Sequence, residues 1–150
     1  MITRELIDDF VSRHDIAFVG ASRNEKKFGY AAYKELKAKG YNLIPVHNQA
    51  ETIQGDKCYP DLKSLPRKVD GALIVLHPED TEKAVKDAVS AGIKRIWLQQ
   101  GAESEKAINY CKENGVKVVH NQCVLMFAEP VASFHKFHRF FKKLFGRLPK

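Results

Sequence analysis

The chain has 150 residues, of which 44% are hydrophobic, and its formal net charge is +7. A chain of this length is typical of one domain, and none of its apolar runs approaches the roughly 20 residues that span a bilayer. The first ten residues include acids and lack the apolar segment of a signal peptide. Three widely spaced cysteines without a CxxC pair indicate free thiols, so we expect a cytoplasmic protein.

The positive charge is concentrated near the end of the sequence. Residues 128–150 contain six lysines and arginines and a single acid, Glu129. Phenylalanines recur there at helical spacing, which predicts a basic amphipathic helix appended to a domain over residues 1–127. We favour docking of this helix on its own sheet or on a partner subunit. Contact with anionic lipid or with nucleic acid is the alternative, and we expect no nucleic-acid partner.

Between residues 3 and 119, helical patterns alternate with short apolar runs. Continuous runs such as 16–20 are typical of strands that are buried on both faces, as in a parallel sheet. The alternation predicts an α/β fold with a doubly wound, mostly parallel sheet of about five strands. In chain order the predicted elements are helix 3–13, strand 16–20, helix 29–39, strand 41–46, strand 69–76, helix 80–91, strand 94–98, a helix from 103 or 104 to 114, and strand 116–119.

The ends of these elements carry local signals. Thr3 is a suitable first residue for the opening helix, Asp80 or Thr81 for the helix over 80–91, and Ser104 or Glu103 for the last helix of the domain. Pro45 has no amide hydrogen, so it must lie near the end of its strand or at an edge of the sheet.

The first strand leads directly into a small-residue loop. Gly20 permits a sharp turn after the strand, and a helix follows from Gly29. A strand, a small-residue loop and a helix form the phosphate-binding corner of nucleotide folds, because loop amides and the positive helix end attract an anion. Arg23, Lys26 and Lys27 add charge that suits a ligand with several phosphates. A solvated basic loop explains the charge equally well.

Ligands of such sheets bind beyond the carboxyl ends of the strands. The five loops expected there offer small residues, amides, imidazoles and one thiol, and no carboxylate; they are 20–23, 46–48, 76–78, 99–101 and 120–123. An NAD site needs an acid after the second strand, where this sequence has Pro45-Val46-His47-Asn48. The first loop also lacks GxGxxG.

Five motifs, in order and with matching spacing, resemble the small stand-alone CoA-binding proteins, whose domain also occurs in the alpha subunit of succinyl-CoA synthetase. The resemblance covers about residues 14–126. The motifs are Gly20-Ala21-Ser22-Arg23, Lys27-Phe28-Gly29, Ile44-Pro45-Val46, Trp97-Leu98-Gln99 with Gly101, and Asn121-Gln122-Cys123.

The resemblance implies a Rossmann-like fold that binds coenzyme A or an acyl-CoA. The backbone of Gly20, Ala21, Ser22 and Arg23, with Lys27 and the following Phe28-Gly29, would hold the phosphates. Pro45, Val46 and Asn48 would line the adenine and ribose side. Leu76, Gln99, Gly101, Asn121 and Cys123 would face the pantetheine arm. The sequence departs from the family at His47, where asparagine is common, and at His77.

The resemblance also implies that the related synthetases carry their phosphorylated histidine in further domains. We find no nucleophile with a base and an orienting group, so we expect no catalytic residue and no catalysis of its own. A homodimer or an acyl-CoA enzyme is the expected type of protein partner. The alternative is an NAD(P)-dependent or other nucleotide-dependent enzyme on the same fold.

Two minor alternatives concern single side chains. His47, His77 and His120 with Cys123 could converge on a metal, but no two of them have short ligand spacing, and we expect no metal site. Cys123 could be a reactive thiol, whereas a buried, inert cysteine is the favoured interpretation. Trp97 is expected in the core.

Overall fold

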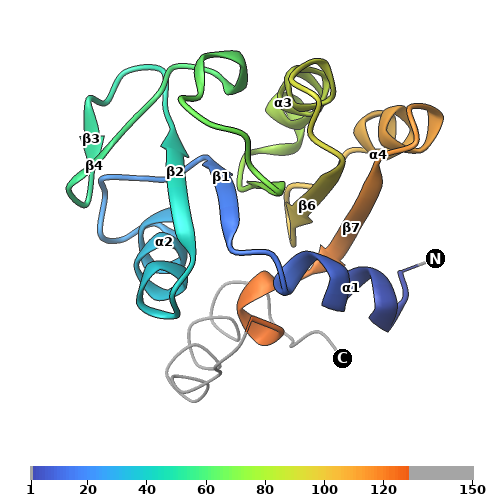
Figure 1. The fold of residues 1–150 in the computed structure, drawn as a ribbon, viewed down its shortest axis with the longest axis horizontal. Helices are drawn as coiled ribbons and strands as arrows, with labels where there is room; N and C mark the ends of the chain where they lie inside the picture. The colour runs from blue at the N-terminus through green and yellow to red at the C-terminus, as the bar shows by residue number, and fades with distance from the viewer. Residues whose placement is uncertain (1, 129–150) are drawn as a thin grey trace.

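A single sheet of five parallel strands, in the order β2-β1-β5-β6-β7, forms the centre of the molecule (Figure 1). This computed structural model describes residues 2–128, and it confirms the predicted α/β class. The strands are β1 (Asp15–Val19), β2 (Asn42–Val46), β5 (Gly71–Ile74), β6 (Arg95–Gln99) and β7 (Lys117–Gln122). Pro45 lies one residue before the end of β2, which is an edge strand, as its missing amide hydrogen requires.

Helices cover both faces of the sheet. Successive side chains of a strand point to opposite faces, so Ile16 and Phe18 of β1 join one apolar cluster and Ala17 and Val19 join the other. The first cluster lies under α1 (Arg4–Val11), α2 (Phe28–Ala38) and the 3-10 turn η2 (Val124–Met126). The second lies under α3 (Pro78–Ser90) and α4 (Glu105–Glu113), on the opposite side of the sheet in Figure 1.

The capping predictions are confirmed for two helices and wrong for a third. The Thr3 hydroxyl accepts a hydrogen bond from the Leu6 amide, and Ser104 caps α4 in the same way. However, α3 begins at Pro78 rather than at 80, because proline at the first helical position has a suitable φ and needs no partner for an amide hydrogen. The Thr81 hydroxyl instead donates to the Ala102 carbonyl at 2.7 Å, which ties α3 to the loop after β6.

The long connection after β2 contains a hairpin that the sequence patterns did not reveal. Its strands are β3 (Thr52–Ile53) and β4 (Asp56–Lys57), followed by the 3-10 turn η1 (Leu62–Ser64). Gln54 and Gly55 both have positive φ, as a tight type I′ turn requires. The Tyr33 hydroxyl of α2 donates to Asp56 at 2.5 Å, so the hairpin is held against α2.

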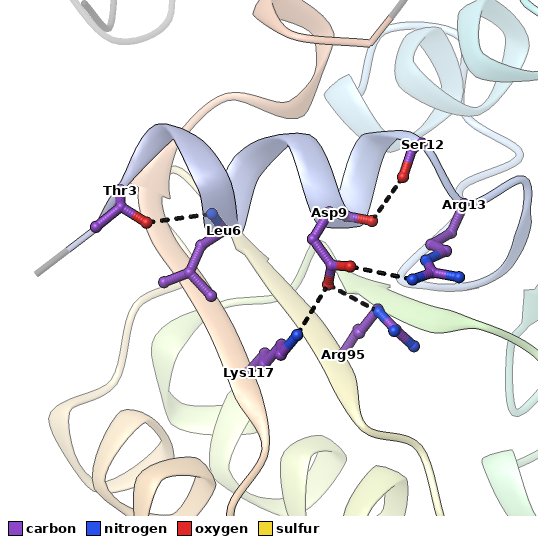
Figure 2. Close-up of polar contacts among 7 residues, drawn as sticks. All are labelled: Thr3, Leu6, Asp9, Ser12, Arg13, Arg95 and Lys117. Atoms are coloured by element: carbon purple, nitrogen blue, oxygen red, sulfur yellow. Dashed lines mark hydrogen bonds and ion pairs between the residues drawn. The ribbon is translucent and has the colours of Figure 1, made fainter.

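The strand beginnings are held together by an ion cluster under α1, shown in Figure 2. The Asp9 carboxylate pairs with Arg13 at 3.1 Å, with Arg95 of β6 at 2.8 Å and with Lys117 of β7 at 3.7 Å. Burial raises the pKa of Asp9, but the hydrogen bonds and charges of these cations outweigh it and leave the pKa below its ordinary value of 3.8. A single carboxylate therefore links α1, β6 and β7 at this edge of the sheet.

The predicted basic helix over 128–150 lies outside the described residues, except for Ala128. Within residues 2–128 no helix combines the length and the apolar character that crossing a membrane requires.

Candidate functional site

The chain passes from β1 to β2 on one side of β1 and then crosses to β5 on the other side. Such a reversal of strand order opens a crevice beyond the carboxyl ends of the two central strands. Gly20 follows β1 at this position, and its φ is +101°. A Cβ atom on Gly20 would lie 2.0 Å from the Val75 carbonyl oxygen, just beyond β5. Glycine is therefore required here by both conformation and space.

The beginning of α2 packs equally closely on this turn. A Cβ atom on Gly29 would lie 2.5 Å from the Gly20 carbonyl oxygen. Lys27 occupies the capping position, and its side chain forms no hydrogen bond with the first amides of α2. Within residues 2–128, the amides of Ala21, Ser22, Arg23 and Gly29 have no hydrogen-bond partner. They surround one corner, which can accept an anion.

The cations of this loop are exposed and unpaired. Arg23, Lys26 and Lys27 form no ion pair with any carboxylate in the described part of the chain. The loop keeps its shape through short-range bonds, in which Ser22 accepts from the Asn24 amide and Asn24 accepts from the Lys26 amide. The backbone is thus ordered while the charges remain available to a ligand.

The loop after β2 lies beside the same corner. The His47 Nδ1 accepts hydrogen bonds from the amides of Gln49 and Ala50 at 3.0 and 2.9 Å, the task that an asparagine side chain performs in an Asx turn. Burial lowers the pKa of His47, and the charge of Arg23 lowers it further. Arg23 also opposes the rise in the pKa of the Cys58 thiol that burial causes. Arg23 therefore lies near both residues.

The expected adenine-side residues differ in exposure. Pro45 and Val46 are buried within β2, whereas Asn48 is exposed in the turn that His47 caps. Tyr59 follows the hairpin and pairs with β2, accepting from the His47 amide and donating to the Pro45 carbonyl. The segment after the hairpin therefore lies along the edge of β2, a feature that sequence reasoning missed.

Residues expected along the pantetheine arm fall into two settings. Leu76 is partly exposed next to Gly20. Gln99 and Cys123 are 1% and 0% exposed, and the Gln99 Oε1 accepts from the Val124 amide at 3.0 Å. Burial raises the pKa of the Cys123 thiol to about 12, so the thiol is protonated at neutral pH and the reactive-thiol alternative is disfavoured.

A carboxylate lies at this edge, contrary to the expectation of none. Glu103 folds back from α4, and its oxygens accept from the Gly101 amide at 3.0 and 3.1 Å and from the Asn121 amide at 3.2 Å. The expected loop over 120–123 is also wrong in part, since β7 continues to Gln122. The Trp97 indole, which is fully buried as predicted, donates to the Gln122 carbonyl and holds this extension.

The remaining alternatives gain no support from the geometry. Among residues 2–128, no three side chains of the metal-ligating types cluster, so the histidines considered above do not converge with Cys123. A hollow of about 660 Å³ lies where the chain enters β5 and β6, at the opposite edge of the sheet. Its lining is apolar residues, exposed cations, a serine and a glycine, without the converging groups of a reaction site: Leu62, Lys63, Leu65, Arg67, Lys68, Val69, Ser90, Ala91, Gly92 and Ile93.

Comparison with known proteins agrees with this fold and corner. Residues 14–129 match the family model described as CoA binding domain. The chain is 28% identical over 130 residues to the alpha subunit of the ADP-forming acetate–CoA ligase II of Pyrococcus furiosus. That match covers 79% of this chain and 28% of the subunit, so the chain spans less than a third of this relative's length.

Two solved structures of small archaeal proteins are similar over most of their length. One is a hypothetical protein from Pyrococcus horikoshii, with a TM-score of 0.81 and 29% identity, covering 85% of this chain and 91% of that one. The other is a conserved hypothetical protein from Pyrococcus furiosus, with a TM-score of 0.71 and 38% identity, covering 74% and 96%.

Proposed function

The chain belongs to the CoA-binding domain family, and from this premise we propose that it binds coenzyme A or an acyl-CoA at the carboxyl edge of its sheet. The observation that carries the proposal is the corner around Gly20. Four amides without partners among the described residues and three unpaired cations surround it. A diphosphate needs such a combination of backbone donors and positive charge.

In this proposal the backbone of Gly20, Ala21, Ser22 and Arg23 holds the diphosphate, with Gly29 and Phe28 at the start of α2. Lys27 adds a charge-assisted hydrogen bond. The absence of a side chain at Gly20 and Gly29 keeps the corner open, since a Cβ at either position would overlap backbone atoms. These residues fit the phosphates of CoA.

The rest of the ligand crosses the neighbouring strand ends. Pro45, Val46 and Asn48 line the adenine and ribose side, next to Arg23 and His47. The pantetheine arm passes Leu76 and continues toward Gly101 and Asn121. Gln99 and Cys123 support this side from beneath, because Gln99 fixes the Val124 amide and both side chains are buried.

We further propose that the chain has no catalysis of its own and that a partner supplies it in any acyl transfer. The support is that the Pyrococcus furiosus relative is named as a subunit, of which this chain matches 28%. A homodimer is the alternative assembly. Co-purification with a second protein that gives acyl-CoA ligase activity only in the complex supports the first proposal. Acyl-CoA ligase activity of the pure chain contradicts it.

Calorimetry with a panel of ligands tests the binding proposal. CoA and acetyl-CoA are expected to bind, whereas NAD binds much more weakly, because no acid among residues 46–50 is available for its ribose hydroxyl. NADP and ATP complete the panel. Binding of NADP without binding of CoA contradicts the proposal and favours the nucleotide-dependent enzyme.

Substitution of Lys27 tests the location. Lys27→Ala is expected to weaken CoA binding about 5- to 20-fold, the range for an exposed charge-assisted hydrogen bond. The matched control is Lys68→Ala, an exposed lysine before β5 at the other edge of the sheet, which should leave the affinity unchanged. If the two variants bind CoA with equal affinity, Lys27 is not part of the binding site.

A further inference from the structure

The loop after β6 and the end of β7 present two backbone amides to one point. The amide hydrogens of Gly101 and Asn121 both donate to the carboxylate of Glu103, and Gly101 reaches both of its oxygens. One donor lies in the loop after β6 and the other in β7, 20 positions apart in sequence. The arrangement therefore joins two strand ends and is more than a local turn.

An irregularity in the sheet lies at one of these amides, that of Asn121. Trp97 of β6 pairs with Val119 of β7, but Gln99 pairs with Gln122, so β7 contains one extra residue at this position. A bulge of this kind leaves one residue out of the ladder and redirects it. Asn121 has a φ of +62° and Gly101 a φ of +98°, and both amides donate to Glu103.

The Glu103 carboxylate is held by these amides and by no cation in the described part of the chain. Gly101 and Asn121 are exposed and Glu103 is half-buried. Hydrogen bonds in such a setting exchange readily with other acceptors, since each contributes little net free energy. The amides of Gly101 and Asn121 thus already bind a carboxylate, so a carboxylate or carbonyl oxygen is the type of acceptor that suits them.

Resting on the proposed CoA site, we propose that the amides of Gly101 and Asn121 form a subsite for the oxygen of an acyl group, which Glu103 occupies until an acyl-CoA displaces it. The subsite lies between β6 and β7, and the phosphate corner follows β1. These are two to three strand spacings apart, about 12 Å, which an extended pantetheine arm spans. Free CoA ends in a thiol and cannot replace the carboxylate as an acceptor for two amides, so Glu103 makes the site sensitive to acylation.

The subsite is tested first without CoA. In Glu103→Ala, acetate titrated into the millimolar range is expected to shift the NMR signals of the Gly101 and Asn121 amides in a saturable manner. Sodium chloride at the same ionic strength should not shift them. The wild-type protein should respond more weakly, because its own carboxylate fills the subsite. Unchanged amide signals in Glu103→Ala overturn the proposal.

The second test compares ligands. Removing the internal competitor is expected to raise the affinity for acetyl-CoA relative to CoA about 3- to 10-fold, and Glu103→Gln to raise it less. The control is Glu105→Ala, because Glu105 is an exposed acid in the first turn of α4. In this variant the ratio of the affinities for acetyl-CoA and CoA should stay at the wild-type value. A titration with CoA and acetate together distinguishes a thioester oxygen from a free carboxylate as the occupant.

The outcomes separate this inference from the proposed function. If wild type binds neither CoA nor acetyl-CoA, the proposed function fails and the acetate titration still decides whether the amides accept an oxygen. If wild type binds CoA but the ratio is the same in Glu103→Ala, Glu103→Gln and Glu105→Ala, CoA binding stands and the acyl subsite is wrong. A lowered melting temperature of Glu103→Ala with an unchanged ratio assigns Glu103 to loop stability alone and also overturns it.

Discussion

Both edges of the parallel sheet carry cations, but the partners of these cations differ between the two edges. Where the strands begin, Asp9 gathers Arg13, Arg95 and Lys117, and Asp15 pairs with Arg67. Where they end, the loop after β1 keeps three cations without a carboxylate partner in residues 2–128. The paired cations at the first edge join elements of the fold, and we propose that the three cations at the second bind an outside anion. A count of basic residues cannot make this distinction.

The largest expected effect concerns the turn at the ligand edge. Gly20→Ala adds a positive-φ strain and a Cβ that would lie 2.0 Å from the Val75 carbonyl oxygen. We expect it to lower the free energy of unfolding by about 3–5 kcal/mol, or to prevent folding. The measurement is urea denaturation followed by circular dichroism.

Gly40→Ala is the matched control for that change. Its φ of +94° is similar, but a Cβ there meets nothing within 4 Å. It should therefore cost only the conformational penalty of about 1–2 kcal/mol. Equal losses for the two variants would mean that the close approach of the β1 and β5 ends contributes nothing.

The ion cluster at the other edge should give an acid-dependent effect. The pKa of Asp9 is lower in the folded than in the unfolded chain, so unfolded molecules bind the proton first as the pH falls. The contribution of Asp9 is complete above about pH 4 and is lost as the pH falls through its folded value. Asp9→Asn should lower the free energy of unfolding at pH 7 by about 1–2 kcal/mol.

Asp8→Asn is the control on the same helix, because Arg4 is the only ion-pair partner of Asp8 among residues 2–128 and both side chains are more than half exposed. Its loss should be about 0.3–0.5 kcal/mol. Chemical denaturation at pH 7 and pH 3 measures both variants. If the difference between wild type and Asp9→Asn is the same at the two pH values, the cluster does not stabilise the fold through the ionised carboxylate.

The smallest expected effect tests whether Arg23 lies between the two loops. The charge of Arg23 lowers the pKa of His47, together with the larger effect of burial. Arg23→Ala should therefore raise the pKa of His47 while leaving it below 6.5, as measured by NMR of the imidazole. Lys26→Ala should leave it as in wild type. If the pKa of His47 changes in Lys26→Ala but not in Arg23→Ala, the cation beside His47 is Lys26 and the account is contradicted.

Much of this arrangement could be predicted from the sequence, because the relevant signals are local. The continuous apolar run before Gly20 indicates a buried parallel strand, Gly20 permits a sharp turn after it, and a helical pattern opens at Gly29. These predictions are confirmed by the strand order, by the positive φ of Gly20 and by α2, which begins at Phe28. The roles of the individual site residues in binding remain predictions.

The missed features depend on the tertiary structure. The hairpin turn has Gln54 before Gly55, and glutamine is not among the residues typical of a type I′ turn. The extension of β7 depends on the Trp97 hydrogen bond and on the bulge beside it. Glu103 lies next to a helix start, where acids are common, so its contact with Asn121 of another strand could not be read from spacing.

The most direct test of the central claim is a CoA titration of ¹⁵N-labelled protein, with the backbone amides followed by NMR. The account predicts that the largest saturable shifts occur at Ala21, Ser22, Arg23 and Gly29, while Gly40 stays unchanged. Saturable shifts confined to the edge with Asp9, or no shift in the loop after β1 at saturating CoA, would contradict it.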